Sequence, residues 1–399
     1  MTFITRTIFL GISSIAILIK QFLMAQNLGV EFFGIYSTVF LTVALFQQLG
    51  GFGTQVYYSS LLVKLDDNEK DENTNLLDLA LIPFLLTLPF LLIITKIYLV
   101  SNILALLGSA IAILNCMFII QTTRYYIFDN HKYCKIIALK GILALLPTFI
   151  SFIVPNLIFM LILDLLIMMI LVNRYYTRVN LLSVTFEHFQ EYLKNLFLRY
   201  TPAIFLAGLY TYLVKIYVSI SFSSEVIGVF FFSQILIMIA QNIQYILSVL
   251  IAPMVRRFRS ILQNDTTLYI LSYGACILVN SMIFAVIYFP VSLIVHRTPE
   301  YAAAIPLLLP TILVAIIRAS DLLSIVNMLM DRPVFASIQQ GTSIAMLMLF
   351  IYYFDMTGMD SIAAVKNLLF LEFFSLTIGQ LVCFLSLMFC LRKMSLAVK

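Results

Sequence analysis

The chain has 399 residues, of which 62% are hydrophobic and only 11% are charged. Soluble domains carry roughly 25% charged residues, so a water-soluble fold would leave much of this apolar surface uncovered. The composition predicts an all-α polytopic membrane protein, because a helix satisfies its own backbone hydrogen bonds and can cross a bilayer. The sequence contains no nucleotide loop of the G-x-x-x-x-G-K type, which argues against an ATP-driven pump.

The five cysteines and three histidines are widely scattered along the chain. With no CxxC pair and no clustered ligands, we expect neither a disulfide framework nor a metal site, and no cofactor. The sequence shows no nucleophile, base and acid in a catalytic arrangement, and the loops expected outside the cytoplasm are all short. Membrane polymerases that act on lipid-linked sugars need a large outer catalytic loop, so we expect a protein that is not an enzyme.

Twelve apolar stretches are each long enough to cross a bilayer, which takes about 20 residues. They lie near residues 8–26, 34–60, 77–99, 102–123, 136–154, 156–173, 201–221, 227–252, 268–290, 303–326, 336–354 and 367–391. We interpret the first run as a span and not as a signal peptide, since Lys20 lies inside it and no small-residue cleavage site follows. The turn Val154-Pro155-Asn156 separates the fifth span from the sixth.

The lysines and arginines between the spans favour one side of the membrane. With the N-terminus in the cytoplasm, seventeen fall inside and three outside. The inside set is Arg6, Lys64, Lys70, Arg124, Lys132, Lys135, Arg174, Arg178, Lys194, Arg199, Arg256, Arg257, Arg259, Arg332, Arg392, Lys393 and Lys399, and the outside set is Lys96, Arg297 and Lys366. Because positive loops stay in the cytoplasm, both termini are predicted to be cytoplasmic, which requires an even number of spans.

The segment between the sixth and seventh spans has an amphipathic pattern. Apolar residues recur at helical spacing from Phe186 to Tyr200, with polar residues on the other side. We expect it either to lie along the cytoplasmic surface or to extend the seventh span below the membrane. The first interpretation gives an N-terminal six-helix bundle at 1–173, a linker at 174–199 and a C-terminal six-helix bundle at 200–399.

The two predicted bundles share short motifs at an offset of 194 residues. The hexapeptide 31–36, Glu-Phe-Phe-Gly-Ile-Tyr, corresponds to 225–230, Glu-Val-Ile-Gly-Val-Phe. Further matches at or within one residue of this offset are Gln47-Gln48 with Gln241-Asn242, Arg124 with Arg318, and Lys20 with Lys215. Together they indicate an internal repeat of two bundles that run in the same direction, related by an axis along the membrane normal.

Ionisable side chains inside spans cost about 2.5–3.5 kcal/mol each on insertion scales, so they face a wet cavity or a partner. The cations inside the predicted spans are Lys20, Lys140, Lys215 and Arg318, and the acids are Asp164, Asp321 and Glu372. One interpretation is a cationic cavity for an anionic head group, with the repeat-related Lys20 and Lys215 facing one cleft. The other is internal pairing, as between Arg318 and Asp321 one helical turn apart. Asp164 and Asp321 are also candidates for ion coupling.

Amide and tyrosine side chains extend the predicted substrate site. Gln47 in the second span and Gln241 in the eighth lie on polar faces that either bind sugar hydroxyls or join helices to one another. Most tyrosines are expected in the interfacial belt. Tyr212 is the exception, because it precedes Lys215 by one helical turn.

The segment 25–37, AQNLGVEFFGIYS, resembles the opening of the Wzx-type polysaccharide flippases of the multidrug/oligosaccharidyl-lipid/polysaccharide (MOP) superfamily. That family often shows an lG-x-x-x-(Y/F)-G-x-Y-s stretch between its first two spans. Four further places are also similar to the family: the glycines that end at Gly53, the segment 214–216, the segment 225–230, and Pro253 before Arg256-Arg257. Where many relatives have an acid just before the basic residue of span seven, this chain has Val214, which puts ion coupling at that position in doubt.

The resemblance implies a MATE-like fold in the inner membrane of a bacterium. It implies a substrate of undecaprenyl diphosphate carrying an oligosaccharide unit of O-antigen or capsule type, moved from the cytoplasmic to the periplasmic leaflet by alternating access. Membrane lipids and other polysaccharide-assembly proteins are the further partners that it implies, without nucleic acid. The alternatives are a cation-coupled multidrug exporter on the same fold and a membrane glycan polymerase.

Overall fold

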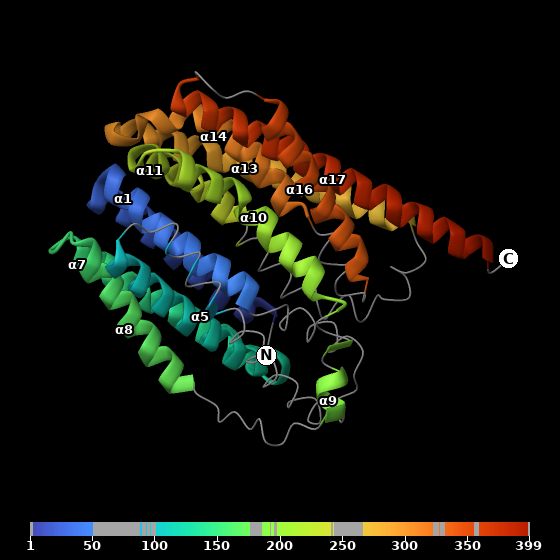
Figure 1. Ribbon diagram of the computed structural model, residues 1–399, viewed down its shortest axis with the longest axis horizontal. Coiled ribbons are helices and arrows are strands. Elements are labelled where there is room, and N and C mark those ends of the chain that lie inside the picture. Colours follow the sequence, from blue (N-terminus) through green and yellow to red (C-terminus); the bar gives the residue numbers. More distant parts are fainter. Residues whose placement is uncertain are drawn as a thin grey trace. The chain divides into compact units, whose positions relative to one another are not determined.

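The computed structural model describes residues 3–50, 101–175, 186–191, 198–240, 266–321, 332–354 and 359–397, with a few isolated positions between them. Within these residues the regular structure is entirely helical, as the composition predicts (Figure 1). The predicted span 77–99 and the later parts of the spans 34–60 and 227–252 lie outside the described residues, apart from isolated positions.

The chain divides into two compact units, Met1–Phe231 and Phe232–Lys399. We call them unit 1 and unit 2. The division falls within helix α11 (Ser224–Ser233), so this helix begins in one unit and ends in the other. The six-helix bundles and the linker at 174–199 remain a prediction.

Unit 1 contains the first five long helices that the structure describes. They are α1 (Phe3–Gly50), α5 (Asn102–Phe128), α6 (Asn130–Leu143), α8 (Leu157–Tyr175) and α10 (Thr201–Ser221), accompanied by the short helices α7 (Leu145–Ser151) and α9 (Phe186–Glu191). Helix α1 packs against α5, α6 and α10, and α5 packs against α8. The predicted spans 102–123, 156–173 and 201–221 are confirmed, as is the non-helical turn at residues 154–156.

Helix α1 consists of two arms that meet at Gly29, whose φ of 74° and ψ of 172° are outside the helical range. This conformation is essentially restricted to glycine. The Nζ of Lys20 lies 4.8 Å from the ring centroid of Phe40, whereas a straight helix would separate these residues by about 30 Å along its axis. The chain therefore reverses at Gly29, and residues 3–28 and 30–50 form the predicted first span and the start of the second, side by side.

The predicted span 136–154 corresponds to the apolar helical stretch His131–Ser151, which is interrupted at Ala144 between α6 and α7. Pro147 has no N–H to donate to the carbonyl of Leu143, and its ring crowds that carbonyl. Helix α6 accordingly ends at Leu143. The proline is visible in the sequence, and it explains a break that apolar content alone does not predict.

Unit 2 contains α13 (Thr266–Arg297), a 3₁₀ helix (Pro299–Ala304), α14 (Ile305–Ala319), α16 (Pro333–Tyr353) and α17 (Ser361–Ala397). Helix α17 packs against both α14 and α16. The carboxylate of Asp360 accepts hydrogen bonds from the backbone N–H groups of Ile362 and Ala363, so it caps the start of α17. Helices α13, α16 and α17 confirm the predicted spans 268–290, 336–354 and 367–391, with the start of the last moved to Ser361. The predicted span 303–326 is confirmed as far as Ala319, where α14 ends, and residues 322–326 lie outside the described residues.

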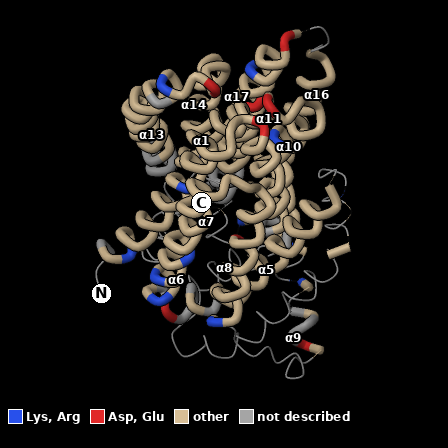
Figure 2. Tube along the Cα trace, turned by 90° about the vertical axis from the view of Figure 1, so that its left-hand side faces the viewer, with Lys and Arg blue, Asp and Glu red and all other residues tan. Residues whose placement is uncertain are grey.

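Nine of the described helical stretches are long and apolar enough to cross a membrane. One of them, 42 residues long, is α1 with its two arms. Helix α13 exposes Met282, Val286, Phe289 and Leu293, which recur at helical spacing and form an apolar stripe. Charged residues interrupt the described helices at few places (Figure 2). Such faces suit hydrocarbon, and the chain is a multi-pass membrane protein.

The turn at Gly29 gives a stability prediction. A Cβ at Gly29 or at Gly11, both in α1, would meet nothing within 4 Å, so the two positions differ in backbone conformation and not in available space. We expect Gly29→Ala to lower the free energy of unfolding by about 1–3 kcal/mol, because alanine is strained at that φ and ψ. Thermal unfolding of the purified protein in detergent measures the change.

Gly11→Ala is the matched control, and we expect it to be neutral or stabilising by up to about 1 kcal/mol. Equal unfolding temperatures for the two variants would contradict the turn described at Gly29.

Candidate functional site

Helix α8 carries Asp164 on its buried face. The residues buried along this helix are Leu157, Met160, Leu161, Asp164, Met168, Leu171 and Val172, at the three- and four-residue spacing of one helix face. The opposite face is apolar and exposed, for example at Leu166 and Ile170. The carboxylate is therefore directed into unit 1, where an ionised group needs a charged partner.

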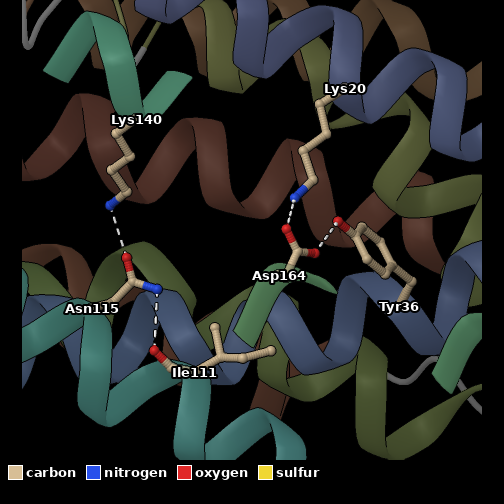
Figure 3. A network of polar contacts seen from close by, with 6 residues as sticks. All are labelled: Lys20, Tyr36, Ile111, Asn115, Lys140 and Asp164. Atoms are coloured by element: carbon tan, nitrogen blue, oxygen red, sulfur yellow. Dashed lines mark hydrogen bonds and ion pairs between the residues drawn. The ribbon is translucent and has the colours of Figure 1, made fainter. Parts of the chain in front are cut away.

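Lys20 of the first α1 arm provides that partner (Figure 3). Its Nζ lies 2.5 Å from Oδ1 of Asp164, and the side chains of both residues are less than one-tenth exposed. The Tyr36 hydroxyl, on the second α1 arm, donates to Oδ2 of Asp164 at 3.4 Å. Two arms of α1 and helix α8 are thus joined at one carboxylate.

Aromatic rings surround the ammonium group of Lys20. Its Nζ lies 4.8 Å from the ring centroid of Phe40 and 5.9 Å from that of Tyr36. A desolvated cation over a ring face is stabilised by roughly 2 kcal/mol. The carboxylate and the rings together hold Lys20 in a fixed position, so it is a poor candidate for an isolated cation that awaits a substrate.

Lys140 of α6 has a different environment. Its Nζ donates to Oδ1 of Asn115 on α5 at 2.7 Å, and the Asn115 amide in turn donates to the carbonyl of Ile111 at 3.1 Å (Figure 3). The ring centroid of Phe118 lies 4.9 Å from the same Nζ. These neighbours hold the ammonium group without neutralising its charge.

Lys215 of α10 is buried, with 9% of its surface exposed. Its Nζ lies 5.5 Å from the ring centroid of Tyr212, so the structure brings together two residues of the predicted substrate site. Helix α10 packs against α1 within unit 1. Lys215 and Lys20 therefore belong to the same compact unit, and whether they face one substrate cleft remains a prediction.

The interior of unit 1 carries a positive excess. Among its described spans, the charged residues that are buried or half-buried and lie more than a helical turn from the span ends are Lys20, Lys140, Lys215 and Asp164. Three ammonium groups and one carboxylate give a net charge of +2 when all are ionised. In a low dielectric this charge attracts anions more strongly than it would in water.

The interior of unit 2 has the opposite balance. Arg318 donates from Nη2 to Oε1 of Glu372 on α17 at 2.6 Å, and both side chains are buried. Asp321, just past the end of α14, is buried as well. Among the residues of unit 2 that the structure describes, this guanidinium and these two carboxylates give a net charge of −1 when all are ionised.

Neutral polar side chains form hydrogen bonds close to the end of α14, near Arg318. Gln380 donates to the carbonyl of Ile317 at 3.1 Å and accepts from the Tyr273 hydroxyl. Asn280 donates to the hydroxyl of Ser320 at 3.2 Å. Such bonds join α13, α14 and α17 and fix the helix end that carries Arg318.

Two predicted site residues are beyond what the structure describes. Gln241 lies outside the described residues, and the side chain of Gln47 also lies outside them. No group of three or more metal-ligating His, Cys, Asp or Glu side chains occurs among the described residues. The predicted roles of the site residues in binding and coupling remain predictions.

Sequence reasoning missed the partners that come from other helices. Asp164 is 144 residues from Lys20, and Glu372 is 54 residues from Arg318. An acid within one turn is visible in a sequence, whereas these pairs depend on how the helices pack. The sequence does show that acidic residues lie inside the predicted spans. Their number is large enough for some of the cations in those spans to have an acidic partner.

Comparisons with known proteins give the fold. No family model matches the sequence, and no curated protein sequence matches it. An inward-facing multidrug resistance MATE family transporter of the MOP superfamily superimposes with a TM-score of 0.66, at 12% identity over 96% of each chain. An outward-facing multidrug resistance MATE family transporter gives a TM-score of 0.62, at 15% identity over 98% of this chain and 95% of the other.

A MATE structure in complex with MaL6 is a further neighbour, with a TM-score of 0.63 and 14% identity over 98% of this chain and 96% of the other. The chain therefore has the polytopic helical fold of MATE transporters over nearly its whole length. Identities this low show a shared fold and leave the substrate to be argued from the site.

The Lys20–Asp164 pair predicts a strong coupling between two substitutions. Asp164→Leu leaves a buried cation without its carboxylate, which we expect to destabilise the protein by about 3–5 kcal/mol. The double variant Lys20→Met with Asp164→Leu removes both charges, so we expect it to recover most of that loss. Thermal unfolding of the single and double variants in detergent measures the coupling.

Additive losses in the double variant would show that the two side chains do not form the ion pair described here. Lys135→Met, an exposed position on α6, controls for the removal of a charge and is expected to change stability by no more than about 0.5 kcal/mol.

Proposed function

We propose that the chain is a flippase that moves undecaprenyl-diphosphate-linked oligosaccharides from the cytoplasmic to the periplasmic leaflet of a bacterial inner membrane by alternating access. The observation that carries the proposal is the positive excess inside unit 1, made by Lys20, Lys140 and Lys215 against Asp164. A diphosphate is the part of such a substrate that most needs compensation in a bilayer. Lysines suit it, because ammonium groups bind phosphate oxygens through charge-assisted hydrogen bonds.

The four charges of unit 1 have separate tasks in this proposal. Asp164 and the aromatic rings fix Lys20, so this pair holds the α1 arms against α8. Lys140 donates to the Asn115 amide, which is neutral and does not offset the charge of an ammonium group. We assign the diphosphate to Lys140 and to Lys215, whose Nζ lies beside the ring of Tyr212.

Buried amides in unit 2 support a sugar-bearing substrate. Both polar atoms of the Gln339 amide on α16 are buried, and neither has a hydrogen-bond partner in the part of the chain that the structure describes. The amide nitrogen of Gln234 is in the same condition. Unsatisfied buried amides are costly, and hydroxyl groups of a sugar can satisfy them.

A cation-coupled multidrug exporter is the second candidate, and the charge of unit 2 favours it. Asp321 and Glu372 outnumber Arg318 there, and cationic drugs need acidic groups. The two candidates make opposite demands on unit 1, where an excess of lysine repels a cationic drug.

A transport assay separates the two functions. Purified protein in proteoliposomes should translocate a fluorescent undecaprenyl-diphosphate oligosaccharide, and the rate should exceed that of protein-free liposomes. The same proteoliposomes should not accumulate ethidium, a cationic drug, under an imposed proton or sodium gradient. Ethidium transport without lipid translocation would replace the flippase by the exporter.

The lysines of unit 1 give the next prediction. We expect Lys140→Gln and Lys215→Gln each to slow translocation by roughly 10- to 100-fold, because each removes a charged hydrogen bond worth about 1.5–3 kcal/mol. Lys135→Gln is the matched control, since it makes the same change at an exposed position on the helix that carries Lys140.

Lys140→Arg keeps the charge and should retain most of the rate. If Lys140→Gln and Lys215→Gln translocate as fast as Lys135→Gln, then these lysines do not receive the diphosphate.

A further inference from the structure

The first α1 arm and helix α6 begin at the same end of unit 1. The rings of Phe9 and His131, near the two helix starts, have centroids 5.7 Å apart. Further along, the Asn27 amide donates to the hydroxyl of Ser151, in the helix that follows α6, at 2.6 Å. These contacts occur in the same order along both segments, so the segments run in parallel. Two helix N-termini, each the positive end of a helix dipole, therefore lie at the end of unit 1 that is predicted to be cytoplasmic.

The side chains at this end add to the positive dipole ends. Neither helix has an acidic residue in its first turn, although a helix N-terminus favours a carboxylate there. Basic residues gather at the start of α6 (Figure 2). Arg6, Lys132 and Lys135 are the cations, His131 is a fourth basic group, and Asp129 is the acid that caps α6. With the histidine neutral, three cations and one carboxylate give these five residues a net charge of +2.

The two lysines of this group lie in water or at the membrane surface. Lys132 and Lys135 are both exposed, and the Nζ of Lys132 lies 4.2 Å from the ring centroid of Tyr125. Exposed cations of this kind are usual on the cytoplasmic side of a membrane protein. They strengthen the positive potential, but they need no ligand.

Arg6 and His131 differ from the lysines because both are half-buried. The Nε of Arg6 and the Nδ1 of His131 are covered, and neither has a hydrogen-bond partner in the part of the chain that the structure describes. Arg6 interacts electrostatically with Cys134, which lies one helical turn after His131, so the guanidinium is close to this part of α6. Unpaired buried polar groups are costly. A phosphate can accept charge-assisted hydrogen bonds from both side chains after a rotation of their torsions.

Exposed apolar residues lie on the same side of α6 as His131. Ile142 follows His131 by eleven residues, which is three turns of an α-helix, and half of its surface is exposed. Leu146 and Phe149 of α7 are also exposed, and they follow at spacings of four and three residues. A ligand with a phosphate at one end and hydrocarbon beyond it matches this order of residues.

We propose that Arg6 and His131 bind the headgroup phosphate of an anionic phospholipid, whose acyl chain lies along Ile142, Leu146 and Phe149. The inference goes beyond the proposed function, because it concerns a lipid that stays bound at the membrane surface. A phospholipid fits better than a soluble phosphate ion, since the apolar stripe offers the ion nothing to bind. An anionic lipid fits better than a zwitterionic one, since the net charge at this end is positive.

Native mass spectrometry of the purified protein tests the site, because the ratio of lipid-bound to lipid-free protein gives an apparent affinity for the first lipid. We expect phosphatidylglycerol to bind at least tenfold more tightly than phosphatidylcholine. Arg6→Gln should weaken the binding of phosphatidylglycerol at least tenfold. His131→Phe should weaken it at least threefold, because phenylalanine keeps the ring contact with Phe9 and removes both nitrogens.

Lys135→Gln is the matched control, since it removes a positive charge at an exposed position one turn after His131. We expect it to change the affinity by less than twofold. A loss as large as that of Arg6→Gln would show that the lipid responds to diffuse charge, which would overturn the site. Equal binding of the two lipids would overturn it as well, and so would native affinity in Arg6→Gln and His131→Phe. If Arg6→Gln does not fold, His131→Phe decides by the same criterion.

Two further measurements separate this site from other anion sites. Inorganic phosphate in large excess should not displace phosphatidylglycerol, and displacement would replace the lipid by a soluble anion. Lys140→Gln and Lys215→Gln should leave the binding of phosphatidylglycerol unchanged. Binding that these variants lose and Arg6→Gln keeps would move the lipid to the interior lysines and overturn the proposal. The result does not depend on the proposed function, since this lipid can bind whether or not the protein translocates an oligosaccharide.

Discussion

An ammonium group between helices that lie in hydrocarbon needs compensation for its lost hydration, and Lys20 obtains it from Asp164. The pair requires the first α1 arm to lie beside α8, with the carboxylate on the inward face of that helix. Tyr36 extends the requirement to the second arm, which reaches the same carboxylate only because the chain reverses at Gly29.

The same pairing offsets part of the positive charge inside unit 1. Asp164 neutralises one of three interior lysines, and Lys140 is held by an amide that leaves its charge intact. In unit 2 the Arg318–Glu372 pair leaves the balance negative, since Asp321 is buried nearby on the chain. A substrate with an anionic head group matches unit 1, whereas a coupling cation matches unit 2, and a flippase driven by an ion gradient would use both.

Much of the fold was predictable because hydrocarbon imposes a simple rule on sequence. Apolar runs of sufficient length gave the spans, and residues 201–221 form the helix expected of them. The break at Ala144 follows from Pro147, which a reading of apolar content ignores. The site was predictable in part. Lysines inside apolar spans are conspicuous because placing a charge there costs free energy. Tyr212 lies near Lys215, as its spacing in the sequence suggests. The pairing of Lys20 with Asp164 depends on packing between distant segments, for which one sequence carries no local signal.

The account depends on the claim that unit 1 receives a diphosphate through its excess of lysine. Thermal unfolding in detergent with added undecaprenyl diphosphate or undecaprenol, at equal mole fraction, tests it directly, because a ligand that binds the folded state raises the unfolding temperature. We predict a rise with undecaprenyl diphosphate, little or none with undecaprenol, and loss of the difference in the Lys140→Gln, Lys215→Gln double variant. Equal stabilisation by the charged and the neutral lipid would contradict the account.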